Sequence, residues 1–251
     1  MFPFLKTIEK LHQPLVISHR GIHSQPPCPE NTIPAFRNAL EQGADGIELD
    51  LQLTGDDEII VFHDYQLKRL MDISGRLNQF SLKELQRLKF CSEKSDSQTR
   101  IPTLKSVFRE FGAALYYNLE IKRSTGSYRL LIDNLLQLIS RYQLVERIWV
   151  SSFDSRFIRE WYGRNTNIPA ALLFEWWNFF SKRNCKRPEA AFLHPRVRLL
   201  KKIDRLVQLQ KPICFWDVNR ETDFEVITQP PVFAVITDDV RLARSMIPRQ
   251  V

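Results

Sequence analysis

Short apolar runs recur along the chain, and segments with helical periodicity separate most of them. The runs are rich in branched aliphatic and aromatic residues and are too short to be helices. They lie at Leu15–Ser18, Gly46–Leu53, Glu58–His63, Leu115–Ile121, Ile148–Ser152, Ala170–Phe174, Ala191–Leu193, Pro212–Asp217 and Phe233–Thr237. Such alternation of strands and helices is typical of a parallel sheet with helical crossover connections.

Amphipathic segments between the runs predict these crossover helices. They lie at Thr32–Gln42, Thr103–Phe111, Tyr128–Tyr142, Arg156–Tyr162, Val197–Gln210 and Val240–Met246. The first segment has Pro34 near its start and Gly43 just after its end, which is the usual placement of these residues at helix termini. The pattern therefore predicts an α/β protein.

One pair of apolar runs is joined by a connection too short for a crossover helix. Only a polar turn around Gly55-Asp56-Asp57 separates Gly46–Leu53 from Glu58–His63, which predicts an antiparallel β-hairpin. If the hairpin counts as one barrel strand with a returning arm, eight parallel strands remain. Eight is the strand number of a TIM (β/α)8 barrel, which is the fold we predict.

The predicted hairpin has two possible registers, and both bring His63 level with an acidic residue. A two-residue loop at Gly55-Asp56 places His63 opposite Glu48, whereas a loop at Asp56-Asp57 places it opposite Asp50. In either register the returning arm carries the histidine back to the carboxylates of the preceding strand.

Residues 64–102 do not fit the alternation and are predicted to form a small inserted subdomain beside the barrel mouth. They contain one helix-like piece, Ser81–Phe90, and a polar stretch, CSEKSDSQTR, with the composition of an exposed loop. The chain shows no internal repeat. We therefore expect residues 1–251 to form a single barrel domain that carries this insertion.

Composition adds an electrostatic preference to this picture. The chain has 251 residues, of which 43% are hydrophobic and 26% charged, and this composition excludes a disordered or fibrous protein. A formal net charge of +7 favours anionic partners such as phosphate esters or anionic lipid. We interpret the positive excess as a solvated basic surface and expect no nucleic-acid partner.

The cysteines and the apolar runs bear on the compartment. Cys28, Cys91, Cys185 and Cys214 are scattered without metal-type spacing, so we expect free thiols in a reducing environment. The N-terminal residues lack the apolar core of a secretory signal, and no apolar run approaches the roughly 18 residues of a membrane span. These features predict a cytoplasmic protein, and they leave its oligomeric state open.

Polar side chains stand where the predicted strands end, which is where TIM barrels place their reactive residues. The two carboxylates of the second strand are two residues apart and therefore share one face of it, and the strand after the insertion repeats this spacing. The candidates come in pairs: His19 with Arg20, Glu48 with Asp50, and Glu120 with Lys122.

Two interpretations of these residues stay open on spacing alone. Three inward-facing carboxylates repel one another and lose hydration unless a cation balances them. A hard divalent ion, Mg²⁺ or Ca²⁺, suits an all-oxygen site of one aspartate and two glutamates. Alternatively, Arg20 and Lys122 balance the carboxylates in a purely structural ion-pair network.

Many short motifs occur in a fixed order from about residue 15 to about residue 246. They are His19-Arg20-Gly21, Pro29-Glu30-Asn31-Thr32, Ala35-Phe36, Gly43–Asp50, Thr54, Val61–Asp64, Leu67, Arg69, Ile101–Leu104, Leu119–Lys122, Ser151-Ser152-Phe153, Leu193-His194-Pro195, Trp216, Val218-Asn219 and Ile236-Thr237-Asp238. Each piece is weak alone, but the ordered set is specific. With it the chain resembles the glycerophosphodiester phosphodiesterase family, which implies a TIM barrel with an inserted subdomain.

The resemblance also implies a role for each candidate. Glu48, Asp50 and Glu120 match the family's ligand positions for one divalent ion. His19 and His63 match its acid/base pair. Two basic positions match residues that contact phosphate, namely Arg20 and Lys122.

The implied reaction is metal-dependent hydrolysis of glycerophosphodiesters to glycerol 3-phosphate and an alcohol. One histidine would take a proton from the attacking group, and the other would protonate the departing alkoxide. A rival within this enzyme class is lysophospholipase D-type hydrolysis of lysophospholipids. A rival from another class is a catalytically silent barrel that binds anions or membrane, although every implied catalytic position holds a competent residue.

Two aromatic features complete the candidates. Trp216, near the end of a late strand, is a candidate for substrate binding as a pocket wall against the glycerol, with a plain core tryptophan as the rival. The stretch LLFEWWNFFSKRNCKR combines aromatic and basic residues. We favour aromatics that pack a loop helix onto the barrel, with a solvated basic tail, over a peripheral membrane contact or a lid over a lipid chain.

Overall fold

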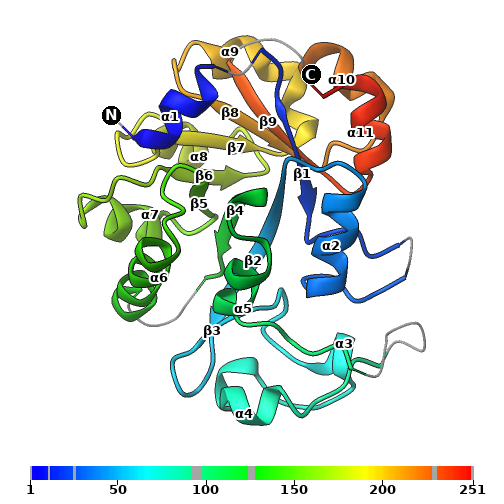
Figure 1. Cartoon of the computed structure of the whole chain (residues 1–251). Coiled ribbons are helices and arrows are strands. Elements are labelled where there is room, and N and C mark those ends of the chain that lie inside the picture. Colours follow the sequence, from blue (N-terminus) through cyan, green and yellow to red (C-terminus); the bar gives the residue numbers. More distant parts are fainter. Residues whose placement is uncertain are drawn as a thin grey trace.

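Eight parallel strands close into a barrel in this computed structural model, which describes residues 2–10, 12–24, 27–91, 98–123, 128–227 and 231–249. Each strand pairs with the next, and the first strand pairs with both the second and the last, which closes the ring (Figure 1). The strands are β1 (Leu15–His19), β2 (Gly46–Leu53), β4 (Tyr116–Ile121), β5 (Ile148–Ser152), β6 (Ala170–Phe174), β7 (Phe192–Pro195), β8 (Ile213–Trp216) and β9 (Val232–Thr237). The predicted TIM barrel is confirmed.

Helices follow most of the strands and cover the outside of the barrel. They are α2 (Ile33–Glu41), α5 (Leu104–Phe111), α6 (Arg129–Tyr142), α7 (Ser155–Tyr162), α8 (Phe179–Cys185), α9 (Ile203–Val207), α10 (Glu221–Ile227) and α11 (Val240–Met246). The predicted helix Val197–Gln210 is wrong as one element, because its first part is the 3₁₀ helix η3 (Val197–Lys202). Helices α8 and α10 were not predicted.

A short N-terminal helix, α1 (Pro3–Ile8), contributes a residue to the barrel interior and was not predicted either. Its Phe4 is fully buried and stacks on Trp149 at a centroid distance of 4.9 Å. The same ring contacts Phe192 and Phe233 on two further strands. These aromatic residues fill one part of the barrel interior.

The hairpin after β2 is present, but both predicted registers are wrong. The returning strand is β3 (Ile59–Val61), and Leu51 pairs with Val61. The turn is a three-residue loop with Asp57 in the left-handed region at φ 65°, and this shifts the pairing by one residue from either prediction. His63 therefore lies beyond the strand, and its position depends on the insertion rather than on the ladder.

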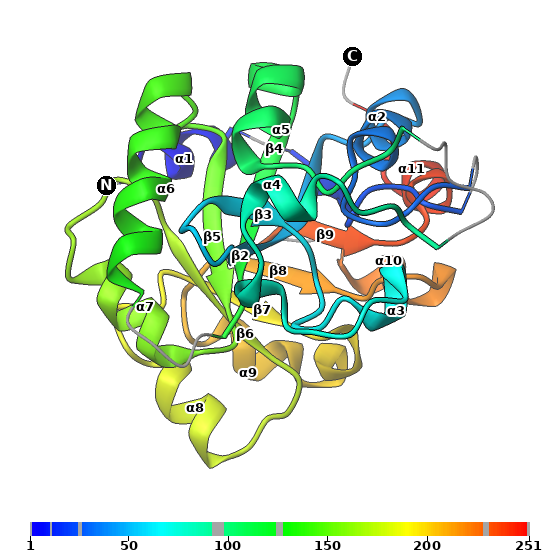
Figure 2. The same cartoon turned by 90° about the horizontal axis from the view of Figure 1, so that it is seen from below.

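The insertion packs around a hydrophobic cluster of its own. It contains α3 (Lys68–Met71), the 3₁₀ helix η1 (Leu77–Gln79) and α4 (Leu82–Leu85), and it extends from the end of the hairpin (Figures 1 and 2). The cluster consists of Ile60, Phe62, Leu67, Met71, Leu77, Leu85, Phe90 and Ile101. The predicted helix Ser81–Phe90 is shorter than expected, and residues 92–97 of the predicted exposed loop lie outside the described residues.

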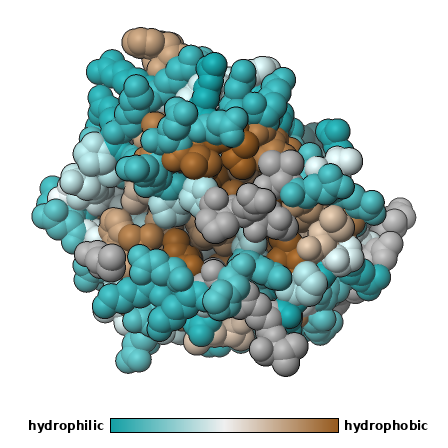
Figure 3. Space-filling view, turned by 90° about the horizontal axis from the view of Figure 1, so that it is seen from above, coloured by the Kyte–Doolittle hydropathy of each residue, from teal (hydrophilic) through white to brown (hydrophobic). Residues whose placement is uncertain are grey.

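The surface and the cysteines agree with the composition. Hydrophilic side chains cover most of the face in Figure 3, and hydrophobic residues show only in patches between them. All four cysteines are free thiols. Within the described ranges, no helix combines the length and the apolar character that crossing a membrane requires.

Candidate active site

Three carboxylates meet at the mouth of the barrel because of strand register. The Cα of Asp50 pairs with that of Glu120, and Glu48 lies two residues before Asp50 on the same face of β2. One oxygen from each of the three side chains lies within 4.8 Å of the others. Leu49 and Leu51, which alternate with these carboxylates along β2, point outward into the core beneath the helices.

The burial of this cluster makes its negative charge costly. Burial, reinforced by the neighbouring charge of Asp50, raises the pKa of Glu48 to about 8. Burial acts in the same direction on Asp50, but Lys122 and Arg20 outweigh it and lower the pKa of Asp50 to about 2. The Oε1 atom of Glu48 is buried, and no described residue donates a hydrogen bond to it. The donor set and this unsatisfied oxygen fit a hard divalent cation.

The ion pairs of the alternative interpretation are also present. Lys122 Nζ lies 2.8 Å from Glu120 Oε1 and 3.3 Å from Asp50 Oδ1. Arg20 Nε lies 3.2 Å from Asp50 Oδ2, which also accepts a hydrogen bond from Asn31. These pairs balance Asp50 and Glu120, but they leave Glu48 Oε1 without a donor. The network alone therefore does not satisfy the cluster.

The local backbone explains how Arg20 reaches the carboxylates. Arg20 and Gly21 both adopt the left-handed conformation, with φ of 56° and 76°, so the chain turns sharply after β1. The amide of Arg20 donates to the carbonyl of Glu48, which ties this turn to the second strand. A Cβ at Gly21 would lie 2.6 Å from the backbone of Ala35, so only glycine fits there.

His19 is held at the mouth by an aspartate from the other end of the chain. Its Nδ1 donates to Asp238 Oδ1 at 2.8 Å, and its Nε2 lies 3.9 Å from Glu48 Oε2. Burial opposes protonation of the ring, but the hydrogen bond with Asp238 and the charge of Glu48 prevail and raise the pKa of His19 to about 9. Asn219 in turn donates to Asp238 Oδ2. The sequence motifs contain Asp238 and Asn219, but they assigned neither a role.

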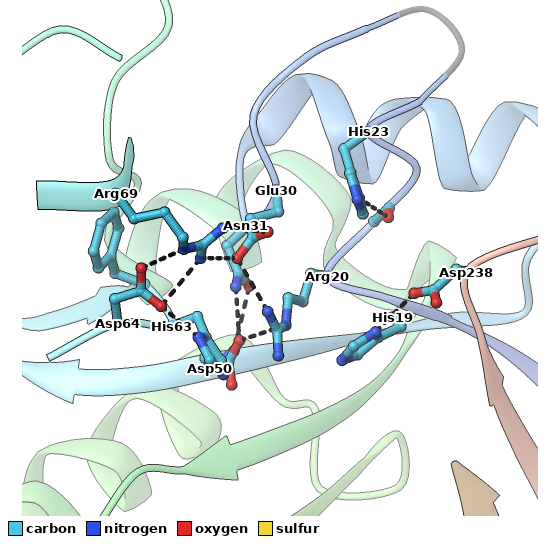
Figure 4. A network of polar contacts seen from close by, with 12 residues as sticks. His19, Arg20, His23, Glu30, Asn31, Asp50, His63, Asp64, Arg69 and Asp238 are labelled. Atoms are coloured by element: carbon cyan, nitrogen blue, oxygen red, sulfur yellow. Dashed lines mark hydrogen bonds and ion pairs between the residues drawn. The ribbon is translucent and has the colours of Figure 1, made fainter. Parts of the chain in front are cut away.

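His63 has an equivalent partner, and Figure 4 shows the contacts that link it to Arg20. The Nδ1 atom of His63 donates to Asp64 Oδ1 at 2.7 Å. Arg69 donates from Nε to Asp64 at 2.5 Å and from Nη2 to Glu30 at 2.7 Å. Glu30 also accepts from Arg20 Nη1 at 3.1 Å. One chain of contacts therefore runs from His63 to the guanidinium beside Asp50, and the charge of His63 also favours ionised Asp50.

The predicted residues of β1, β2, β4 and the insertion thus lie together, and Trp216 lies across the mouth on β8. Its indole N–H donates to the carbonyl of His194 at 3.0 Å, and its ring contacts Phe153 edge-on at 5.7 Å. The guanidinium of Arg196 lies 5.2 Å from the ring centroid. Trp216 is partly buried, so it forms part of the wall, and its predicted contact with glycerol stays a prediction.

The favoured interpretation of the aromatic stretch after β6 holds for one residue only. Trp177 packs against Phe174 and the core. The side chains of Trp176, Phe179 and Phe180 are 63%, 71% and 72% exposed, so the expectation that they pack onto the barrel is wrong. The reason is that α8 begins only at Phe179 and projects from the rim (Figure 2).

Comparisons with known proteins agree with this geometry. The sequence model of the glycerophosphoryl diester phosphodiesterase family matches residues 19–242. A glycerophosphodiester phosphodiesterase of Caldanaerobacter subterraneus subsp. tengcongensis is 36% identical over 90% of this chain and 94% of its own length. The crystal structure of a Silicibacter pomeroyi protein, described as a glycerophosphoryl diester phosphodiesterase, matches this chain with a TM-score of 0.83 at 18% identity. The match covers 98% of each chain.

A second solved structure shares the same fold. It is that of an Oleispira antarctica phosphodiesterase in complex with the product sn-glycerol-3-phosphate, with a TM-score of 0.81 at 24% identity over 94% of this chain and 98% of that one. These similarities confirm the predicted fold, family and enzyme class. The chain belongs to the glycerophosphoryl diester phosphodiesterase family.

Proposed function

We propose that this protein hydrolyses glycerophosphodiesters to glycerol 3-phosphate and an alcohol at the mouth of its barrel. The observation that carries the proposal is the pairing of a buried carboxylate cluster with two histidines. The ring of His19 is held by Asp238 and that of His63 by Asp64, so each Nδ1 is occupied. Because each Nδ1 keeps its proton for a carboxylate, each Nε2 is left to exchange a proton with substrate.

The carboxylates Glu48, Asp50 and Glu120 would hold one divalent ion, Mg²⁺ or Ca²⁺, both of which prefer oxygen ligands. A bound divalent ion supplies charge neutralisation and polarisation of the phosphoryl group. Glu48 Oε1 supports this assignment because it has no donor among the described residues. The choice between the two metals is tested by measuring turnover with each ion after treatment with EDTA.

Arg20 and Lys122 would bind the phosphoryl oxygens. Arg20 presents a planar fork suited to two oxygens, whereas Lys122 acts as a point charge. Both cations already lie within 3.3 Å of carboxylate oxygens of the cluster. A phosphodiester that enters between them therefore meets cations whose positions are fixed before it binds.

One histidine would then remove a proton from the attacking water, and the other would protonate the departing alkoxide. Release of choline and glycerol 3-phosphate from glycerophosphocholine tests this reaction directly. Turnover is expected with Mg²⁺ or Ca²⁺, to disappear with EDTA, and to disappear in Glu48→Ala and His63→Ala. Near-normal activity in both variants would refute the site, whereas absence of wild-type turnover with either ion would favour a catalytically silent barrel.

The exposed aromatic residues after β6 favour a second candidate, hydrolysis of lysophospholipids at a membrane surface. Trp176, Phe179 and Phe180 project into solvent, and the stretch continues with exposed Lys182, Arg183 and Lys186. Arg198 also lies 3.3 Å from the centroid of the Trp176 ring. Apolar rings beside positive charges suit the headgroup region of an anionic bilayer.

Vesicle sedimentation tests this peripheral membrane contact. Wild-type protein is expected to sediment with vesicles that contain phosphatidylglycerol, and Trp176→Ser/Phe179→Ser/Phe180→Ser is expected to stay in solution. Tyr162→Ser is the matched control because Tyr162 is a 50% exposed aromatic residue on α7. Equal sedimentation of all three proteins would reject the contact. Lysophosphatidylcholine turnover, measured beside glycerophosphocholine turnover, decides whether the contact serves a lipid substrate.

The free cysteines suit a reducing compartment, and we place the protein in the cytoplasm on that basis. Cell fractionation followed by immunoblotting is expected to recover the protein with soluble cytoplasmic markers. Recovery with secreted proteins would contradict this assignment.

A further inference from the structure

A cavity of about 790 Å³ opens beside the carboxylate cluster. Its walls come from the ends of β2 and β4, the turn of the hairpin, the insertion, and helices α6 and α7. This volume lies within the range of pockets that bind small molecules, and it is larger than a glycerol needs. The cavity therefore has room for the part of the substrate that differs between glycerophosphodiesters.

Lys122 joins this cavity to the proposed reaction site. It is one of the lining residues, and its Nζ lies 2.8 Å from Glu120 and 3.3 Å from Asp50. Gln52, another lining residue, donates from its amide to the carbonyls of Phe62, His63 and Asp64. The wall of the cavity is thereby tied to the backbone that carries His63.

The charge of the cavity wall is predominantly positive. Among the described residues, its lining includes Arg76, Lys122, Arg123 and Arg156 but only one acidic residue, Asp57. Two of these cations already form short ion pairs. Lys122 pairs with the carboxylate cluster, and Arg156 Nη2 lies 2.8 Å from Asp154. The other two, Arg76 and Arg123, have no short ion pair among the described residues and can bind a ligand.

These two arginines are accessible. The side chain of Arg123 is 78% exposed, and its ion pair with Asp154 is long, at 4.0 Å. Arg76 is exposed, and no carboxylate within the described ranges lies in ion-pair distance of it. Guanidinium groups in this state bind phosphate or carboxylate through paired hydrogen bonds, and they repel a quaternary ammonium.

The opposite side of the mouth suits the glycerol end of the substrate. In the ring of eight barrel strands, β8 lies across from β4, so Trp216 lies across the mouth from Lys122. Trp216 and Phe153 present an aromatic surface there, and Arg196 beside the Trp216 ring is paired with Asp217. A neutral three-carbon alcohol fits such a surface, and the phosphodiester would bridge to the basic cavity.

We infer that the cavity receives the leaving alcohol and that Arg76 and Arg123 select alcohols that carry a phosphate or carboxylate of their own. This inference rests on the proposed function and names the substrate class of the same site. Choline esters are then expected to be hydrolysed, but with a lower kcat/KM than esters of anionic alcohols, because their cationic group enters a basic cavity. The chemistry that recognises the ligand is an anionic group on the released alcohol.

Two substrates that differ by one phosphate test the inference: glycerophosphoinositol and glycerophosphoinositol 4-phosphate. The wild type is expected to show a kcat/KM about tenfold higher for the phosphorylated diester, as one or two charge-assisted hydrogen bonds provide. In Arg76→Gln/Arg123→Gln this ratio is expected to fall to near one, with turnover of glycerophosphoinositol, whose alcohol is uncharged, unchanged. Arg141→Gln is the matched control, since Arg141 is an exposed arginine near the far end of α6.

The outcomes separate this inference from the proposed function. If the wild type hydrolyses both diesters equally, or if the double variant keeps the wild-type ratio, the basic cavity does not select the alcohol, although the enzyme assignment stands. If the wild type hydrolyses no glycerophosphodiester with either divalent ion, the proposed function is refuted and the inference falls with it. Raising the salt concentration is expected to reduce the wild-type ratio, because screening weakens exposed charge pairs.

Discussion

The Nδ1 atom of His19 lies 2.8 Å from Oδ1 of Asp238, a residue 219 positions later in the chain. The contact exists because β1 pairs with β9 and closes the barrel, which brings the end of the last strand next to the end of the first. Asn219 holds the second oxygen of Asp238 at 2.8 Å. The orientation of this histidine is therefore a property of barrel closure.

Replacing Asp238 by asparagine is expected to lower kcat for glycerophosphocholine about tenfold to a hundredfold, because the ring loses the partner that fixes its orientation. Asp238 contributes to the raised pKa of His19, which is about 9, so loss of this carboxylate also lowers that pKa. The limb of the kcat–pH profile that His19 sets should then move to lower pH. The matched control is Asp239→Asn, which removes a neighbouring carboxylate but keeps a side-chain oxygen that can cap α11, and which leaves the partner of His19 in place. A pH profile that is unchanged in Asp238→Asn would contradict this role.

Arg69 is expected to act as a positioning residue for His63. Arg69→Gln releases Asp64 and Glu30 together and is expected to reduce kcat about tenfold to a hundredfold, since small displacements of a proton-transfer group are costly. Arg69→Lys is expected to restore only part of the activity, because lysine lacks the fork that joins two carboxylates. The kcat and KM of both variants are to be measured separately.

The neighbouring Lys68 provides the control for Arg69. It forms an exposed ion pair with Asp72 four residues along the chain, away from the histidine. Lys68→Gln should leave kcat unchanged and the unfolding midpoint nearly unchanged, because an exposed ion pair contributes little to stability. Equal effects of the Lys68 and Arg69 substitutions would show that the insertion is merely sensitive to lost charge.

His194 is expected to make the fold less stable in acid. Burial lowers the pKa of His194 to about 3, from 6.5, and neither ring nitrogen has a hydrogen-bond partner among the described residues. Between these two pKa values the unfolded chain binds a proton that the folded chain excludes, so stability falls as the pH falls from 6.5 towards 3 and is unaffected above 6.5. The contribution approaches about 1.4 kcal/mol per pH unit within that window.

Urea unfolding of the wild type and His194→Leu at several pH values measures this contribution. The variant is expected to lose stability less steeply between pH 6 and pH 4, and to be at least as stable at pH 7 because two unpaired nitrogens are removed. Identical slopes in the two proteins would mean that His194 takes up its proton in the folded state.

Much of the fold could be predicted from the sequence because its strands are buried on both faces and read as continuous apolar runs. The short elements could not. Helix α1 has only six residues, and its place depends on Phe4 filling the barrel interior. The hairpin register depended on a three-residue turn with Asp57 in a left-handed conformation, which no apolar pattern encodes.

The candidate site shows the same division. The two-residue spacing of Glu48 and Asp50 predicted that they share a face, since it reflects strand geometry alone. The partner of His19 was missed because its contact depends on tertiary structure, whereas Asp64 adjoins His63 in the sequence. Asp238 reaches His19 through barrel closure, and Glu30 reaches Asp64 only through Arg69, 39 residues further along the chain.

Titration calorimetry of EDTA-treated protein with Mg²⁺ and with Ca²⁺ tests the central claim that Glu48, Asp50 and Glu120 hold one divalent ion. The wild type is expected to bind one ion per chain, and Glu175→Gln, which alters a carboxylate paired with Arg198 outside the cluster, is expected to bind equally well. Glu48→Gln is expected to lose this binding and, without metal, to unfold at a higher temperature than the wild type, because a costly buried charge is gone. Absence of binding to the wild type, or undiminished binding to Glu48→Gln, would contradict the account.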